Sequence, residues 1–228
     1  YSDSLALIAI NNALNIGWPT DTPISTWEGI GMNDGVCVDS LNLSSMNISG
    51  QIPPEIADLT DLRFLNISQS ALSGNIPPEI GELSNLESLW LFLTDLEGEI
   101  PEEIGYLPNL IRLGIGNNKL SGSLPSSLGN LDLIAFSVKN NELSGCYDEN
   151  LLNLCQFANN FVSEGNFFDA PFEDFCNNEV GKCNYFQLDT KVILEGPYDP
   201  TQSQMTTILN TERGLLPGQT PSSELAAP

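Results

Sequence analysis

A short pattern, Gly-x-Ile/Leu-Pro, recurs along the middle of the chain at a constant spacing. Its glycines stand 24 residues apart, at Gly50, Gly74, Gly98 and Gly122. A fixed period of roughly 20 to 50 residues indicates stacked structural repeats, in which each unit packs only against its neighbours. The pattern therefore predicts a solenoid, a fold that offers an extended surface for holding a partner.

Five units align on this pattern, and they share the apolar spacing L-x-x-L-x-L at their start. Residues 38–61, 62–85 and 86–109 align without a gap, a fourth unit starts at Leu110 and is shorter, and a fifth starts at Leu133. One unit alone buries too little apolar surface to offset the entropy of ordering its backbone, which costs about 1 to 2 kcal/mol per residue. We therefore expect the units to stack, with their short strands paired in a parallel sheet.

The full repeat, L-x-x-L-x-L-x-x-N/x-x-L-x-G-x-I-P, resembles the plant-type leucine-rich repeat of receptor-kinase ectodomains and polygalacturonase inhibitors. The resemblance implies an α/β solenoid, a right-handed superhelix with a short parallel β-sheet on its concave face. It also implies an N-terminal helical cap, which fits an apolar helical run over residues 5–14. We expect Asp3 or Ser4 to cap that helix and Trp27 to plug the first coil.

Four of the five cysteines lie late in the chain, in two closely spaced pairs. A metal site is disfavoured because the chain has no histidine and no C-x-x-C motif. Closing each short loop would stabilise the end of the solenoid by about 2 to 3 kcal/mol. We therefore predict a disulfide-bonded C-terminal cap in which Cys146 pairs with Cys155 and Cys176 with Cys183. Cys37 is expected to be an unpaired and largely buried thiol.

The same patterns divide the chain into four predicted segments. Residues 1–37 form the N-terminal cap, 38–156 the five repeats, 157–184 the C-terminal cysteine cap, and 185–228 a junction with a β-strand and a Pro/Ser/Thr tail. The stretch V-I-L-E-G-P-Y-D at 192–199 resembles a segment of large secreted proteins of Bacteroidota, whose surface leucine-rich proteins the cysteine cap also resembles. This resemblance implies that the solenoid is one module of a longer surface polypeptide.

Acidic residues outnumber basic residues by 30 to 7, so the formal net charge is −23. This sign disfavours nucleic acid and anionic membrane surfaces as partners. No segment approaches the roughly 18 consecutive apolar residues that indicate a membrane span. The predicted disulfides favour an extracellular or cell-surface location. No cofactor is expected, and the sequence contains no calcium-binding loop motif.

Strand periodicity identifies the side chains that face the concave surface. In L-x-x-L-x-L-x-x the leucines point into the core, so the third, fifth and seventh positions face outward and the eighth lies at the edge. These positions carry large apolar groups in the middle repeats, followed by basic groups, whereas Gly114 and Gly116 are expected to leave a shallow floor beside them. We predict a ligand-binding patch that consists of Phe64, Trp90, Phe92, Leu93, Arg112, Asn117 and Lys139.

The patch favours a non-catalytic binding module that acts in protein–protein interaction or adhesion. Trp90 and Phe92 would anchor a protein or peptide, and Arg112 and Lys139 would pair with its carboxylates. The alternative ligand is an acidic glycan, with Trp90 stacked on a sugar ring. A further alternative, inhibition of a secreted polysaccharide-degrading enzyme, follows only from the resemblance to polygalacturonase inhibitors. Catalysis is disfavoured because the chain has no histidine and no G-x-S-x-G motif.

Overall fold

The structure, a computed structural model, describes residues 2–33, 35–160, 164–178 and 182–183. All of them belong to the first of the two units into which the chain divides, residues 1–184. The predicted strand and tail at 185–228 lie outside the described residues. The four segment boundaries proposed above therefore stay predictions.

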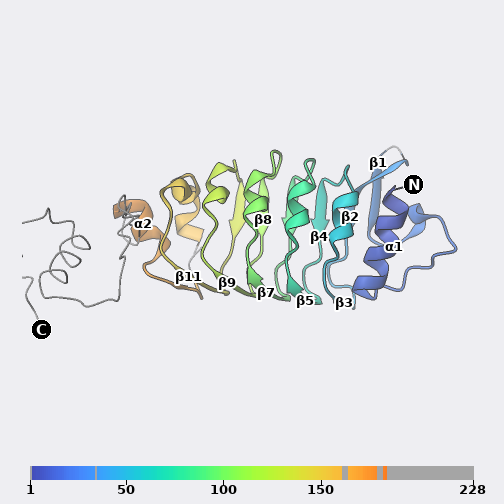
Figure 1. The fold of residues 1–228 in the computed structure, drawn as a ribbon, viewed down its shortest axis with the longest axis horizontal. Helices are drawn as coiled ribbons and strands as arrows, with labels where there is room; N and C mark the ends of the chain where they lie inside the picture. Colours follow the sequence, from blue (N-terminus) through green and yellow to red (C-terminus); the bar gives the residue numbers. More distant parts are fainter. Residues whose placement is uncertain (1, 34, 161–163, 179–181, 184–228) are drawn as a thin grey trace, which may run out of the picture. The chain divides into compact units, whose positions relative to one another are not determined.

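The N-terminal cap is built around helix α1 (Ser2–Leu14), which packs against the first coil of the solenoid (Figure 1). Asp3 and Ser4 lie inside this helix, so the expectation that one of them caps it is wrong. The Asp3 carboxylate instead accepts a hydrogen bond from the backbone N–H of Val38 at 2.9 Å. Asp3 thus ties the helix to the first repeat.

Two tryptophans are buried in the apolar core at the N-terminal cap. Trp27 follows a short 3₁₀ helix, η1 (Ile24–Thr26), and is buried, as expected for a plug. It stacks on Trp18 with ring centroids 5.1 Å apart. The Trp18 indole N–H donates to the Glu28 carbonyl at 3.0 Å, so the buried ring has no unsatisfied donor.

The repeats build two six-stranded sheets that run side by side along the stack (Figure 1). The first sheet contains, in spatial order, β1 (Ile30–Asn33), β2 (Cys37–Asn42), β4 (Phe64–Asn66), β6 (Ser88–Trp90), β8 (Arg112–Gly114) and β10 (Ala135–Ser137). The second contains β3 (Ser49–Gly50), β5 (Ala71–Asn75), β7 (Asp95–Glu99), β9 (Lys119–Gly122), β11 (Glu142–Gly145) and β12 (Phe167–Phe168). Strands from successive repeats pair in parallel, whereas β1 is antiparallel to β2.

A short 3₁₀ helix after each Pro forms the third side of the first four repeats. These helices are η2 (Pro54–Asp58), η3 (Pro78–Glu82), η4 (Glu102–Tyr106) and η5 (Ser126–Asn130). Each turns one apolar side chain into the core. In η2, η3 and η4 acidic residues lie in the first turn or at the end, whereas η5 contains none. One continuous apolar core runs from α1 to the C-terminal cap. The predicted α/β solenoid with a helical N-terminal cap is confirmed.

The C-terminal cap is disulfide-bonded, but the predicted pairing is wrong. Cys146 bonds to Cys183 and Cys155 to Cys176. Cys37 is free, as expected, although it is only half-buried.

Helix packing explains the pairing that the short-loop argument missed. The long 3₁₀ helix η6 (Glu149–Asn160) carries Cys155 away from Cys146, and α2 (Phe172–Asn178) packs against η6 with Cys176 beside Cys155. The chain then returns to Tyr147, whose carbonyl accepts from the backbone N–H of Cys183 at 2.8 Å. The bonds therefore span 37 and 21 residues, and closing longer loops restricts the unfolded chain more.

Candidate binding surface

The strand register brings the three predicted patch residues that lie on strands, Phe64, Trp90 and Arg112, onto one face of the first sheet. Phe64 pairs with Ser88, and Ser88 pairs with Arg112 on the next strand. Trp90 pairs with Gly114 in the same register. Because side chains alternate along a strand, these residues point away from the buried leucines of the sheet. We call this surface, together with Phe92 and Lys139 two residues beyond the ends of β6 and β10, the open face.

Trp90 and Phe92 form an edge-to-face pair on the open face. Their ring centroids are 6.3 Å apart, their planes meet at 86°, and both side chains are half-buried. The expected shallow floor is wrong, because a Cβ atom on Gly114 would overlap the six-membered ring of Trp90, and one on Gly116 would lie 3.4 Å from Cγ of Lys139. The indole covers Gly114, and the backbone of Lys139 and the Ser137 hydroxyl lie closest to Gly116; both glycines are buried.

Arg112 and Lys139, the basic residues of the patch, differ from the other described basic residues in that they lack an ion pair with a described carboxylate. Those others all form ion pairs: Arg63 with Glu87 at 2.5 Å, Lys119 with Asp95 at 2.7 Å and Lys182 with Glu149 at 3.2 Å. Arg112 and Lys139 form no ion pair within the described part of the chain. Arg112 instead donates a long hydrogen bond, 3.4 Å, to the Ser88 hydroxyl. The open face therefore presents two positive charges that are not committed to a carboxylate.

Three residues after the end of each of the strands β2, β4, β6, β8 and β10, the chain turns a corner toward the second sheet, and two predicted patch residues occupy such corners. All five corner residues have φ between 54° and 60°: Ser45, Gln69, Leu93, Asn117 and Asn140. Asn adopts this left-handed conformation readily, whereas Leu is strained there. Asn117 accepts a hydrogen bond from the Asn140 amide at 2.8 Å, while Leu93 leaves 49% of its surface exposed.

Behind the corners of the later repeats runs a ladder of asparagine side chains. The Asn118 carbonyl oxygen accepts from the backbone N–H of Leu96 at 3.2 Å, and its amide donates to the Leu91 carbonyl at 2.8 Å. Equivalent bonds tie each later coil to the one before it through Asn118, Asn141 and Asn166. In the first three repeats the same position holds Met46, Ser70 and Thr94.

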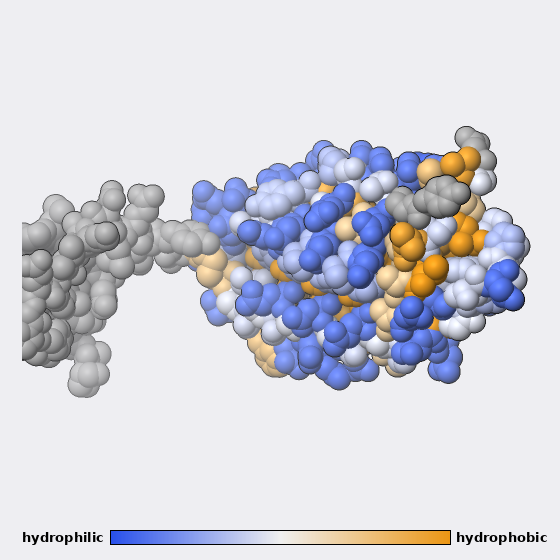
Figure 2. Space-filling view, turned by 45° about the vertical axis from the view of Figure 1, so that its right-hand side comes forward, coloured by the Kyte–Doolittle hydropathy of each residue, from blue (hydrophilic) through white to orange (hydrophobic). Residues whose placement is uncertain are grey.

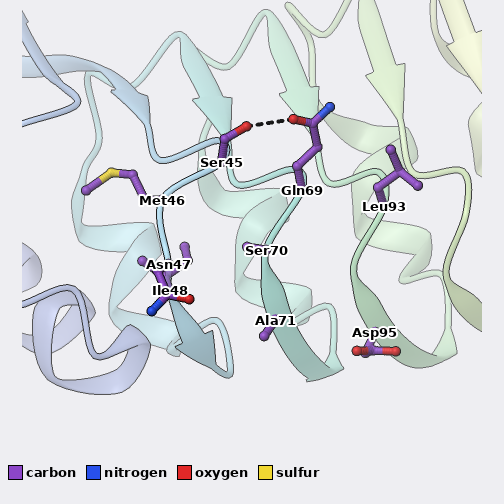
Figure 3. A pocket seen from close by; sticks show the side chains of 9 residues that line it. All are labelled: Ser45, Met46, Asn47, Ile48, Gln69, Ser70, Ala71, Leu93 and Asp95. Carbon is purple, nitrogen blue, oxygen red and sulfur yellow. Dashed lines mark hydrogen bonds between the residues drawn. The ribbon is translucent and has the colours of Figure 1, made fainter.

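A groove of about 450 Å³ opens where this ladder is missing, between the ends of the first-sheet strands and the start of the second sheet (Figure 3). A hydrogen bond of 2.6 Å from the Ser45 hydroxyl to the Gln69 carbonyl oxygen crosses its rim. This groove was not predicted from the sequence. The sequence does show that the first three repeats lack an asparagine at the position of Asn118 and Asn141. The groove is lined by Ser45, Met46, Asn47, Ile48, Gln69, Ser70, Ala71, Leu93 and Asp95.

The described residues contain no group of three or more His, Cys, Asp or Glu side chains placed to hold a metal ion. In the same part of the chain, no helix has the length and apolar character needed to cross a membrane.

Outside the open face, the exposed large apolar side chains include Leu5 and Val36 in the N-terminal cap and Tyr106 at the end of η4. An apolar area near the N-terminal end is visible in Figure 2, against a largely hydrophilic surface over the repeats.

Parallel coils, two sheets and capped ends define a leucine-rich-repeat solenoid. A family model, Leucine Rich Repeat, matches residues 37–59, 61–83 and 109–131. A structure of the BIR3–SERK2 complex from Arabidopsis thaliana contains a chain that is 30% identical, with coverage of 74% of this chain and 95% of that chain and a TM-score of 0.64. The chain therefore belongs to the leucine-rich-repeat family.

Two other Arabidopsis thaliana structures are similar to the chain. The BIR2 ectodomain is 30% identical, with coverage of 73% of this chain and 93% of that chain and a TM-score of 0.60. The ectodomain of the receptor kinase GASSHO1/SCHENGEN3, in complex with CASPARIAN STRIP INTEGRITY FACTOR 2, is 29% identical, covering 73% of this chain and 21% of that chain, with a TM-score of 0.64. No curated protein sequence matches. The resemblances to Bacteroidota proteins and to polygalacturonase inhibitors gain no support from these comparisons.

Proposed function

We propose that the chain is a non-catalytic extracellular binding module that holds a segment of a protein partner on the open face of its first sheet. The observation that carries this proposal is the half-exposed pair of Trp90 and Phe92 beside Arg112 and Lys139. Aromatic and arginine side chains dominate the energetically important centres of protein interfaces. Contiguous exposed apolar groups of this kind mark contact sites.

The charges of the open face favour a particular kind of partner segment. The net charge of −23 attracts basic proteins and repels acidic ones at long range. At short range, Arg112 and Lys139 offer charge-assisted hydrogen bonds to a carboxylate. We infer a partner that is neutral or basic overall and that places an apolar side chain against Trp90 and a carboxylate near Arg112.

Similar proteins support a protein partner and an extracellular location. One is a receptor-kinase ectodomain in complex with CASPARIAN STRIP INTEGRITY FACTOR 2, and another belongs to the BIR3–SERK2 complex. Disulfides persist in oxidising compartments outside the cytosol, which fits the two bonds of the C-terminal cap. Glycan binding and enzyme inhibition gain no such support, so glycan binding serves here as an alternative outcome of the test.

The test uses the full chain with its disulfides formed, probed in parallel with a displayed random-peptide library and a glycan array. A selected peptide should bind Trp90→Ala about 30-fold more weakly than the native chain, because removing a central aromatic anchor costs about 2 kcal/mol or more. Tyr106→Ala is the matched control, since it removes an exposed aromatic side chain from η4. It should bind within about twofold of the native chain.

Two results would contradict the proposal. The first is a selected peptide that binds native and Trp90→Ala chains equally. The second is a glycan signal that is lost in Trp90→Ala while the library yields no binding peptide, which would replace a protein partner by a glycan.

A further inference from the structure

Leu93 connects the open face to the groove at the strand ends. Its neighbour Phe92 belongs to the aromatic pair of the open face, and Leu93 itself lines the groove. In Figure 3, Ser45, Gln69 and Leu93 lie in a row at the rim, on three successive repeats, and Ala71 and Asp95 lie on the opposite side. The two surfaces are therefore continuous around the corner.

The conformation of Leu93 is unfavourable for stability. Its φ of 56° places a bulky side chain in the left-handed region, where the equivalent residues of the next two repeats are both Asn. Leu93 is 49% exposed, so burial of its side chain contributes only part of the hydrophobic stabilisation that a fully buried leucine provides. The left-handed φ recurs at all five corners, so what distinguishes Leu93 is that its corner holds a bulky apolar side chain and not Ser, Gln or Asn.

The chemistry of the groove fits an extended peptide. Leu93, Met46 and Ala71 supply apolar surface, while the Gln69 and Asn47 side chains supply neutral amides that can pair with peptide N–H and C=O groups. Asp95, the single charged residue of the lining, is paired with Lys119 at 2.7 Å. In a chain of net charge −23, this groove is nearly neutral.

Other occupants fit the groove less well. Its lining contains no aromatic ring on which a sugar could stack, and its one carboxylate is insufficient for a cation site. A second copy of this chain would bring the same large negative charge to the interface.

We propose that the partner segment does not end on the open face but crosses the corner at Leu93, and that its extended continuation lies in the groove between Gln69 and Ala71. This proposal rests on the proposed function, because the open face holds the first part of the same segment. Leu93 is then an apolar contact for the partner, and the missing asparagine ladder makes room for the peptide.

The experiment measures the affinity of a library-selected peptide for variants of the full chain. Leu93→Asn removes the apolar contact and relieves the backbone strain, so it keeps the fold. Ala71→Arg fills the groove from an exposed position. Each should weaken binding by at least about tenfold.

The matched control is Leu152→Asn, which changes an exposed leucine of η6. This variant should bind the peptide within about twofold of the native affinity. The protein is made without N-glycosylation, because Asn47 begins an Asn-x-Ser sequon.

The outcomes separate this proposal from the proposed function. If either Leu93→Asn or Ala71→Arg retains native affinity within about twofold while Trp90→Ala is weakened, the groove proposal is overturned and the open face stands. If Trp90→Ala also retains native affinity, the proposed function fails as well. A library that yields no peptide able to bind the folded chain counts against both.

Discussion

Gly114 determines where the side chain of Trp90 can lie. Because Gly114 has no Cβ, the indole of Trp90 can lie directly against its backbone. The Phe92 ring packs against the indole in an edge-to-face arrangement. An aromatic group that is held on two sides loses little conformational freedom when a partner binds. Under the proposed function, the two aromatic rings would therefore form a preorganised anchor, which a list of concave residues alone does not reveal.

Leu93 provides a stability prediction at the level of one residue. Leu93→Asn should raise the free energy of unfolding by about 0.5 to 1 kcal/mol, because Asn tolerates the left-handed region better than Leu. Urea denaturation followed by circular dichroism measures the change. A decrease in stability would mean that packing of the Leu93 side chain outweighs its backbone strain.

Cys37 provides a pH-dependent prediction. Partial burial raises the pKa of the Cys37 thiol, and the hydrogen bond and negative charge of Asp61, with the charge of Asp3, raise it further. The reactive thiolate should therefore form only at a pH above that of an ordinary thiol. The rate of iodoacetamide alkylation against pH measures the midpoint, because the other four cysteines are in disulfides. Asp61→Asn should lower the midpoint, and a native midpoint at or below the ordinary value would contradict this electrostatic account.

At the scale of the elements, the asparagine ladder joins the later coils through hydrogen bonds between side-chain amides and the backbone of neighbouring coils. Asn141 is 4% exposed, accepts from the backbone N–H of Leu120 at 3.0 Å and donates to the Ile115 carbonyl at 3.1 Å. These bonds join adjacent repeats where a turn would otherwise leave buried backbone groups without partners. The first three repeats lack such an amide, and the groove lies there.

The ladder predicts a large loss of stability from one substitution. Asn141→Ala should lower the free energy of unfolding by about 2 to 4 kcal/mol, because it leaves several buried backbone groups unsatisfied. Asn85→Ala is the matched control, since that exposed amide donates one hydrogen bond, 2.9 Å, to the Thr60 carbonyl. It should cost about 0.5 kcal/mol. Equal losses in the two variants, measured by urea denaturation, would show that the ladder has no special role.

Strand alternation and the repeat period were sufficient to predict the fold and the side chains of the open face, because both depend on local spacing. The disulfide pairing depends on how α2 packs against η6, which no local spacing encodes. The groove depends on which side chains are absent from three successive coils. The position of Trp90 over Gly114 depends on contacts between neighbouring strands. The binding role of the patch residues stays a prediction.

At the scale of the whole molecule, charge is distributed unequally between the sides of the solenoid. Acidic residues lie in the 3₁₀ helices of the third side, as at Glu55, Glu79 and Glu102, whereas Arg112 and Lys139 lie on the open face. Under the proposed function, the negative field of the third side would attract basic partners to the molecule at long range. Under the same proposal, the open face would then select among such partners by contact.

The most direct test of the central claim is photo-cross-linking of a library-selected peptide to the full chain. The photoreactive residue benzoylphenylalanine replaces Phe92 on the open face in one variant and Tyr106 in the other. Our account predicts that the peptide cross-links from position 92 and not from position 106. Cross-linking from position 106 with none from position 92 would contradict the claim that the open face binds the partner.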